Sequence, residues 1–216
     1  MKYTNLERNN SMKIGIDGRA AKWYRGTGIG TYTYQLISCL NNIDNINNYL
    51  LFMPKSFRND ICLKKNFALN TIPPQNKTSF WEEINIPNKI KHNKIELYHV
   101  PQNGVGLPVD KNCKFAITLH DVIPYKMPET VSDRYLKIFS DYIPEIIPKC
   151  DGIITVSNFS KNDIMKAFNF PENKIYVTHL ASEDIYKPLD KNISKYIAQR
   201  YYSIDEDYIL YVGGFS

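Results

Sequence analysis

The sequence is poor in the features that mark metal-binding, secreted or membrane-spanning proteins. It has four cysteines in 216 residues and no C-x-x-C pair, which gives no support for a metal site and favours reduced thiols in a cytosolic protein. No apolar run reaches the roughly 18 to 20 residues that span a bilayer, so any membrane contact is expected to be peripheral. The polar residues 1–11 lack the apolar segment of a signal peptide and are predicted to form a tail.

Long blocks of like charge are also missing. The 27 Lys and Arg residues exceed the 22 Asp and Glu residues only modestly, giving a net charge of +5, and they are scattered along the chain. No basic arm for nucleic acid is present, so we expect no nucleic-acid partner. A mildly basic surface suits phosphate-bearing ligands or anionic lipid headgroups, although an ordinary solvated surface is the simpler interpretation.

What the sequence does have is an alternation of short β-branched runs with longer helical patterns. This alternation predicts an α/β fold, a Rossmann-like parallel sheet with helices on both faces. Strands are expected at Lys13–Asp17, Tyr49–Met53, Ile95–Val100, Phe115–Leu119, Gly152–Val156 and Lys174–Thr178. Helices are expected at Gly30–Asn41, Phe80–Lys91, Asp133–Ile147 with an interruption at Pro144, Phe159–Phe168 and Ile193–Tyr202.

The domain organisation follows from where these patterns stop. Residues 12–187 are predicted to form the Rossmann-like domain, followed by a polar linker over 188–207. Residues 208–216 then begin a new apolar strand, Tyr208–Val212, which leads into Gly213 and Gly214. Such a strand should continue into a phosphate-binding turn, so we expect a truncated second domain. An apolar strand without neighbours is expected to pack on another surface or to self-associate.

Ligands of open parallel sheets gather at the carboxyl ends of the strands, so residues just beyond each strand are the first site candidates. Asp17 and Arg19 directly follow the first strand, and a loop containing Gly26, Gly28 and Gly30 leads into a helix. Glycines before a helix let backbone N–H groups approach an anion, which the helix dipole also favours. A flexible strand-to-helix turn is the structural alternative, but the three glycines with nearby cations favour ligand contact.

This glycine loop does not match a dinucleotide-binding fingerprint. Gly30 stands one position early, and Thr31 occupies the place of the third glycine. The loop also begins well after the strand rather than directly behind it. An NAD-dependent oxidoreductase is therefore the weaker interpretation.

Two more strand ends carry candidate residues. His120 and Asp121 follow the strand Phe115–Leu119, where an imidazole next to a carboxylate can bind a sugar hydroxyl; a purely structural histidine is the alternative. Ser157 follows the strand Gly152–Val156, where it can cap the next helix or contact a ligand, and one serine can do both. His99 lies inside a predicted strand and is expected in the core.

These motifs together resemble the N-terminal domain of family-4 retaining glycosyltransferases with the GT-B fold, nearest to bacterial mannosyltransferases of surface-polysaccharide synthesis. The matching segments are 16–19, 26–32, 80–83, 119–124, 155–160, 174–178 and 209–214.

The resemblance implies that a hexose, mannose above all, moves with retention from a nucleotide-diphosphate sugar to a glycan or lipid-linked acceptor. The nucleotide sugar is a substrate, so no cofactor or metal is implied. The resemblance gives His120 a catalytic place beside the transferred sugar and brings Gly26, Gly28 and Gly30 to the sugar donor's phosphates.

In the same resemblance Asp17, Arg19, Asp121 and Ser157 line the acceptor side or the cleft, and Gly213 and Gly214 open the donor-binding domain. The fragment alone is expected to be inactive. The protein is expected in the cytoplasm or at the inner face of the membrane. A non-catalytic sugar- or nucleotide-binding module remains the alternative from a different class.

Overall fold

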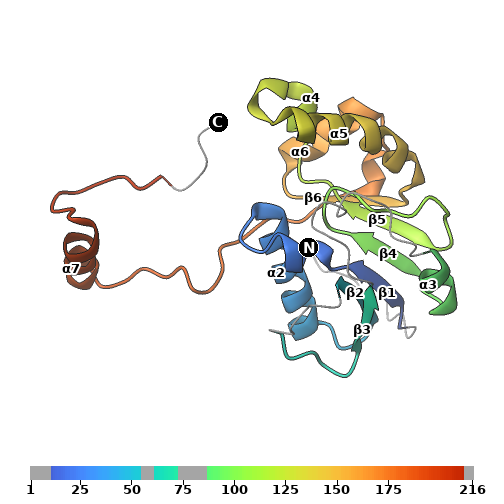
Figure 1. The fold of residues 1–216 in the computed structure, drawn as a ribbon, viewed down its shortest axis with the longest axis horizontal. Helices are drawn as coiled ribbons and strands as arrows, with labels where there is room; N and C mark the ends of the chain where they lie inside the picture. Colours follow the sequence, from blue (N-terminus) through green and yellow to red (C-terminus); the bar gives the residue numbers. More distant parts are fainter. Residues whose placement is uncertain (1–10, 55–60, 73–86, 212–216) are drawn as a thin grey trace, which may run out of the picture. The chain divides into compact units, whose positions relative to one another are not determined.

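The structure, a computed structural model, describes residues 11–54, 61–72 and 87–211. The chain divides into two compact units, Met1–Thr178 and His179–Ser216. The first unit contains the sheet and the helices packed on it (Figure 1). The sheet-bearing unit ends at Thr178, whereas the sequence analysis places the domain boundary at residue 187.

Within the described residues, seven parallel strands form one sheet in the order β3-β2-β1-β4-β5-β6-β7. The chain first winds outward from β1 to β3 and then returns to lay β4 on the other side of β1. The point where the order reverses, between β1 and β4, is where open α/β sheets bind ligands. The strands are β1 (Lys13–Asp17), β2 (Asn48–Pro54), β3 (Phe67–Ile72), β4 (Leu97–Val100), β5 (Lys114–Thr118), β6 (Gly152–Thr155) and β7 (Ile175–Val177).

Helices cover both faces of this sheet. The helices of the first unit are α1 (Arg19–Trp23), α2 (Gly28–Ile43), α3 (Pro87–His92), α4 (Ile123–Lys126), α5 (Asp133–Ile146) and α6 (Asn158–Phe168), with 3-10 turns at Pro128–Thr130, Ile147–Lys149 and Glu172–Lys174. Figure 1 shows α4, α5 and α6 grouped together, away from α2.

The side-chain alternation of β2 shows how the two layers are made. Leu50 and Phe52 pack in a core with residues of α3, α5 and α6. Tyr49, Leu51 and Met53 point the other way and pack with residues of α1 and α2. Strands buried on both faces need apolar residues at every position, which is why β2 reads as a continuous apolar run.

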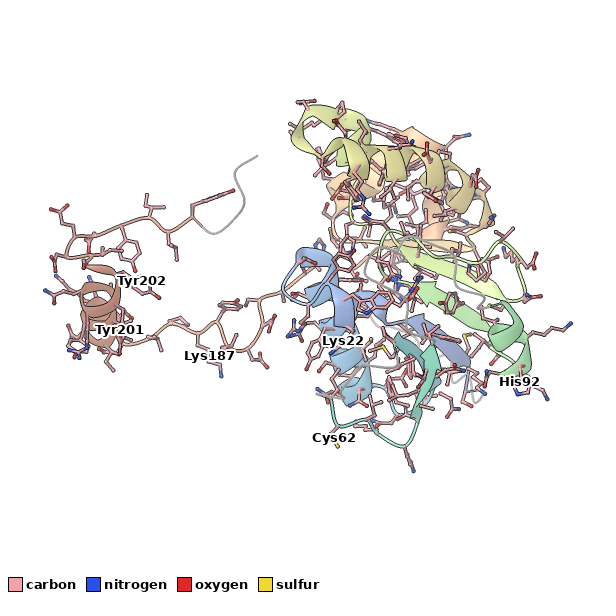
Figure 2. The ribbon with its side chains drawn as sticks, in the orientation of Figure 1. Lys22, Cys62, His92, Lys187, Tyr201 and Tyr202 are labelled. Atoms are coloured by element: carbon pink, nitrogen blue, oxygen red, sulfur yellow. The ribbon has the colours of Figure 1, made fainter. Side chains whose placement is uncertain are left out.

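The Rossmann-like class and six of the strands are confirmed, with ends shifted by a few residues at most. β3, α1 and α4 were not predicted from the sequence. Pro144 does not end α5, which continues past it to Ile146, and the kink expected near Tyr142 stays a prediction. Of the helix expected at Phe80–Lys91, residues 80–86 lie outside the described residues, and the remainder is α3, whose last residue His92 is exposed (Figure 2).

The second unit contains the helix α7 (Lys191–Tyr202). Asp190 caps its first turn by accepting hydrogen bonds from the N–H groups of Asn192 and Ile193. Residues 208–211, the described part of the strand expected at Tyr208–Val212, do not belong to the described seven-stranded sheet, so this strand stays a prediction. A strand requires a neighbouring strand for its backbone groups, and apolar composition alone does not supply one.

Candidate functional site

The candidate site lies at the carboxyl ends of β1, β4 and β5, on both sides of the point where the strand order reverses. Three segments meet there: residues 17–30 behind β1, residues 101–106 behind β4, and residues 119–121 behind β5. Parallel strands bring their carboxyl ends to one edge, so these segments converge although they are far apart in sequence.

The glycine loop ends in the N-terminus of α2. Thr27 caps the helix, its hydroxyl accepting from the N–H of Gly30 at 3.2 Å and donating to the carbonyl of Tyr24 at 2.7 Å. The N–H groups of Gly28 and Ile29 lie in the first turn of α2, where no carbonyl of the helix can accept a hydrogen bond from them. Residues 25–28 are exposed, so this helix end is open to an anionic ligand.

The three positions of the loop differ in whether the fold requires a glycine there. Gly26 adopts a φ of +97°, which favours glycine at this turn. A Cβ on Gly30 would collide with the Tyr24 carbonyl and lie 2.7 Å from the Arg25 nitrogen, so packing of α1 against α2 requires a glycine there. A Cβ on Gly28 would meet nothing within 4 Å. Of the three, Gly28 is therefore the glycine that neither its fold environment nor its backbone angle requires.

Asp17 and Arg19 form a buried ion pair at the end of β1. Arg19 Nη2 lies 2.6 Å from Asp17 Oδ2, Arg19 Nε lies 3.0 Å from each carboxylate oxygen, and both side chains are 0% exposed. Burial alone would lower the pKa of Arg19, but the charge and the hydrogen bonds of Asp17, with a smaller effect of Tyr98, together outweigh burial and raise the pKa, so the guanidinium stays charged. The pair is ionic and hydrogen-bonded internally, and its predicted contact with a ligand stays a prediction.

The loop after β4 packs directly on this ion pair. Gly106, with a φ of +93°, lies against the Arg19 guanidinium, where a Cβ would collide. Gly104, with a φ of +74°, packs against Ile117 and Ile146. The loop is thus fixed on one side by the ion pair and on the other by the core.

His120 is held by the same loop. Its backbone N–H donates to Asn103 Oδ1 at 3.0 Å, and its ring Nε2 lies 3.2 Å from the carbonyl oxygen of Pro101. A carbonyl oxygen can only accept, so Nε2 carries the proton of the neutral ring. Nδ1 of His120 is then an acceptor, suited to a hydroxyl donor.

Both histidines of this region are held neutral. Burial lowers the pKa of His120, against smaller raising effects of the Pro101 carbonyl and the Asp121 carboxylate. Burial also lowers the pKa of His99 to about 4, although the Asp17 carboxylate opposes it and His120 adds to it. His99 is 6% exposed, which confirms the expectation that it lies in the core.

Tyr32, in the second turn of α2, is a site residue that the sequence analysis missed. Its ring lies edge-on to the His120 ring, with centroids 4.7 Å apart and planes at 85°. Its hydroxyl lies 3.2 Å from Thr118 Oγ1, and Thr118 Oγ1 lies 2.9 Å from His99 Nε2. A tyrosine in a helix carries no local sign of such a partner, since the contact joins residues far apart in sequence.

The remaining predicted residues are placed as follows. Ser157 caps α6, its hydroxyl oxygen accepting from the Ser160 N–H at 3.0 Å, which confirms the capping interpretation and leaves ligand contact untested. Asp121 Oδ1 accepts from the N–H of Ile123 at 2.9 Å and so shapes the turn into α4. Gly213 and Gly214 lie outside the described residues.

The described residues contain neither a metal-binding cluster nor a membrane-spanning helix. Nowhere in those parts of the chain do three or more His, Cys, Asp or Glu side chains gather as a metal ion would require. Among the helices that the structure describes, none is long and apolar enough to cross a bilayer.

Comparison with known proteins places this site in a family. The model of Glycosyltransferase Family 4 matches residues 26–181, which is more than half of the chain. The O-antigen chain mannosyltransferase B of Escherichia coli is 29% identical over 96 residues, which cover 44% of this chain and 25% of that protein. A glycosyltransferase from Rickettsia africae ESF-5, known from its crystal structure, is 14% identical with a TM-score of 0.40, covering 88% of this chain and 49% of that one. The family match includes the glycine loop, Tyr32, the loop after β4, His120 and Ser157, and the chain belongs to glycosyltransferase family 4.

Proposed function

We propose that this chain binds a nucleotide-diphosphate sugar and takes part in moving its sugar to a hydroxyl acceptor. The contact between Tyr32 and His120 carries the proposal. Tyr32 stands one helical turn, about 6 Å, from Gly28 at the start of α2. Tyr32 thus connects the helix end proposed to bind the diphosphate with the imidazole proposed to accept a hydroxyl of the attached sugar.

Each part of the site has a proposed role. The N–H groups at the start of α2, reached over Gly26, Gly28 and Gly30, bind the diphosphate. Their fixed positive field stabilises the charge that develops on the leaving phosphate. His120 accepts a hydrogen bond from a hydroxyl of the transferred sugar, since its Nε2 already donates to Pro101.

The acceptor side is proposed at Asp121 and Ser157, with the buried pair of Asp17 and Arg19 supporting the cleft. Mannose as the sugar is supported by the name of the E. coli relative, and a glycan or lipid-linked acceptor by the O-antigen in that name. Retention of the anomeric configuration, expected from the family resemblance, is part of the proposal.

A cytoplasmic protein that touches the inner face of the membrane is the proposed setting. Apolar side chains of α4, of Met127 just after it and of α6 support peripheral contact, because Ile123 is 43% exposed, Met127 49% and Phe159 74%. Lys126 lies among them, with its Nζ 5.6 Å from the centre of the Phe159 ring. Sedimentation with anionic vesicles tests this contact, and Phe159→Ser is expected to weaken it.

The binding proposal is tested by titrating the 15N-labelled chain with GDP-mannose, UDP-glucose and NADH. We expect the sugar nucleotides to shift the amide signals of Gly28, Gly30 and His120, with NADH as the negative control. Preference for NADH, or no shift at the α2 terminus with any sugar nucleotide, would contradict the proposal.

Binding alone does not separate a transferase from a non-catalytic binding module. Transfer of the bound sugar, measured in a protein that joins this chain to a donor-binding domain, separates them, and His120 offers a matched pair of variants. His120→Asn keeps an acceptor oxygen near the position of Nδ1, whereas His120→Ala removes it. We expect the alanine variant to lose about tenfold or more in turnover and the asparagine variant to keep part of it. Equal turnover in the wild type, His120→Asn and His120→Ala would mean that His120 is only structural.

A further inference from the structure

We infer that Tyr32 is a positioning residue for His120, fixed by its hydroxyl through Thr118 to the buried His99. The inference rests on the proposed role of His120, but its test reads the imidazole directly and needs no sugar transfer. Nothing in the glycine-loop pattern assigns this tyrosine a task.

His120 is restrained from two directions. On one side, the loop after β4 supplies the Pro101 carbonyl to the ring and the Asn103 side chain to the backbone N–H. Asn103 is itself held, because its Nδ2 donates to the Tyr135 hydroxyl at 3.0 Å. On the other side the Tyr32 ring stands edge-on at 4.7 Å. An imidazole that left Pro101 would have to displace that ring.

The Tyr32 ring can resist this displacement because its far end is anchored. Its hydroxyl lies 3.2 Å from Thr118 Oγ1 and is also hydrogen-bonded to the Thr178 side chain. Thr118 is 0% exposed, and its hydroxyl reaches His99 Nε2 at 2.9 Å. The anchor therefore joins α2 to the ends of β4, β5 and β7, which are the rigid part of the site.

The anchor is uncharged, which suits its depth. Burial raises the pKa of Tyr32, against lowering effects of the hydrogen bonds from Thr118 and Thr178, so the phenol is neutral. His99 is neutral as well. The other titratable groups around His120 are the Asp121 carboxylate on the same turn and the Tyr135 phenol of α5, whose pKa burial raises to about 12. Hydrogen bonds between neutral groups fix geometry at this site without adding a buried charge.

The consequence for specificity is that His120 keeps Nδ1 as its acceptor nitrogen, because Nε2 is hydrogen-bonded to the Pro101 carbonyl. A substrate hydroxyl that can donate is accepted, whereas a sugar that lacks that hydroxyl leaves no donor for Nδ1. If Tyr32 did not hold the His120 ring, the ring could rotate and offer a ligand either an acceptor nitrogen or a donor N–H. The preference for a sugar with a donating hydroxyl would then weaken.

Long-range 1H–15N correlation spectra of the histidine rings test the inference. The chain has four histidines, and a His120→Gln spectrum identifies the signals of His120. In the wild-type protein we expect His120 as one neutral tautomer, protonated at Nε2, with a pKa below the ordinary value of about 6.5. A ring protonated at Nδ1 would overturn the inference at once.

The variants Tyr32→Phe and Thr118→Val each remove one hydroxyl of the anchor. Each is expected to give averaged tautomer signals for His120 and to move its pKa up toward about 6.5, because a freed ring becomes hydrated. The double variant is expected to do no more than either single one, since both break the same chain. Thr118→Ser retains the hydroxyl and should restore the wild-type spectrum.

Tyr34→Phe is the matched control, because Tyr34 is on the same helix and its ring packs under Arg25 at 3.9 Å instead of against His120. It should leave the His120 signals unchanged. If Thr118→Val does not fold, Tyr32→Phe decides alone. Wild-type tautomer and pKa in folded Tyr32→Phe protein would show that Tyr32 is only packing, whatever the sugar-binding experiments give.

Discussion

Asp17 and Arg19 stand two residues apart at the end of β1 and form an ion pair with no solvent-exposed side-chain surface. Such a pair is costly to break, because removing one partner leaves a buried, uncompensated charge. The loop that holds His120 packs on this pair through Gly106, so the stability of the ion pair and the geometry of the site are connected.

We expect Arg19→Met to lower the free energy of unfolding by about 3 to 5 kcal/mol, because the Asp17 carboxylate loses its buried partner. Urea denaturation measures the change. Lys126→Met is the control, since it removes the bridge from Lys126, whose side chain is 49% exposed, to Asp163, and should cost at most about 1 kcal/mol. Equal losses in both variants would contradict this assignment.

Acid should destabilise the fold through His99. The pKa of His99 is about 4 in the folded protein and about 6.5 in the unfolded chain, so between these values the unfolded state binds the extra proton. This contribution to stability is fully present above pH 6.5 and is lost as the pH falls toward 4, by about 3 kcal/mol. His99→Gln should flatten the pH dependence of urea denaturation in that window. If stability fell with pH as steeply in His99→Gln as in the wild type, groups other than His99 would be responsible for the acid sensitivity.

The glycines of the loop should respond in opposite ways to an added methyl group. Gly30→Ala places a Cβ against the Tyr24 carbonyl and should lower the melting temperature. Gly28→Ala meets open space in a helical residue and should leave stability unchanged or raise it by about 0.4 to 1 kcal/mol. Gly28→Val should instead weaken binding of the sugar nucleotide, since its side chain occupies the anion's approach. If Gly28→Val unfolds, the glycine serves the turn.

Asp44, at the end of α2, makes a smaller contribution to stability that is also lost in acid. Burial would raise its pKa, but hydrogen bonds from Tyr49, from the Asn47 side chain and from two backbone N–H groups lower it to about 2. This stability is present above pH 4 and is lost as the pH falls toward 2. Tyr49→Phe should raise the Asp44 pKa and shift acid unfolding to higher pH, by about 1 kcal/mol or less since Asp44 is only partly buried. Tyr142→Phe, on an exposed part of α5, should have no effect.

The second unit exposes enough apolar surface to predict self-association. Ile209 is 101% exposed and Leu210 72%. Tyr202, at the end of α7 and labelled in Figure 2, is 72% exposed. Light scattering on the full chain and on a chain ending at Lys187 measures the effect, and we expect the shorter chain alone to be monomeric. Two monomers with equal melting temperatures would make this segment a passive tail.

The sequence predicts the architecture well because most strands are buried on both faces and read as apolar runs. β3 could not be predicted in this way because it is an edge strand, in which the buried Phe67 and Ile72 are separated by polar or exposed positions. Its apolar pattern matches neither a buried strand nor strict alternation. α4 is a single turn, too short to show a helical period.

The positions of residues that follow strands could be predicted from the sequence, whereas contacts between distant elements could not. Backbone topology alone brings His120 to the sheet edge, so its place could be inferred. The buried pairing of Asp17 with Arg19, and the anchoring of Tyr32 on Thr118, depend on side-chain directions in the folded protein. Neither pair leaves a local pattern that distinguishes it from surface residues.

The cores on the two faces of the sheet also differ in how much of the chain must be synthesised before each can pack. The core between the sheet and α1 and α2 uses buried residues from Ile16 to Phe67 only, whereas the opposite core runs from Leu50 to Ile175. During synthesis the first face can therefore form early, while β1 keeps an open edge until β4, paired at Leu97, emerges from the ribosome. Pairing with β4 covers this side of β1, so the nascent chain exposes unpaired backbone groups of a central strand until Leu97 is made, and it needs protection from wrong pairing during that interval.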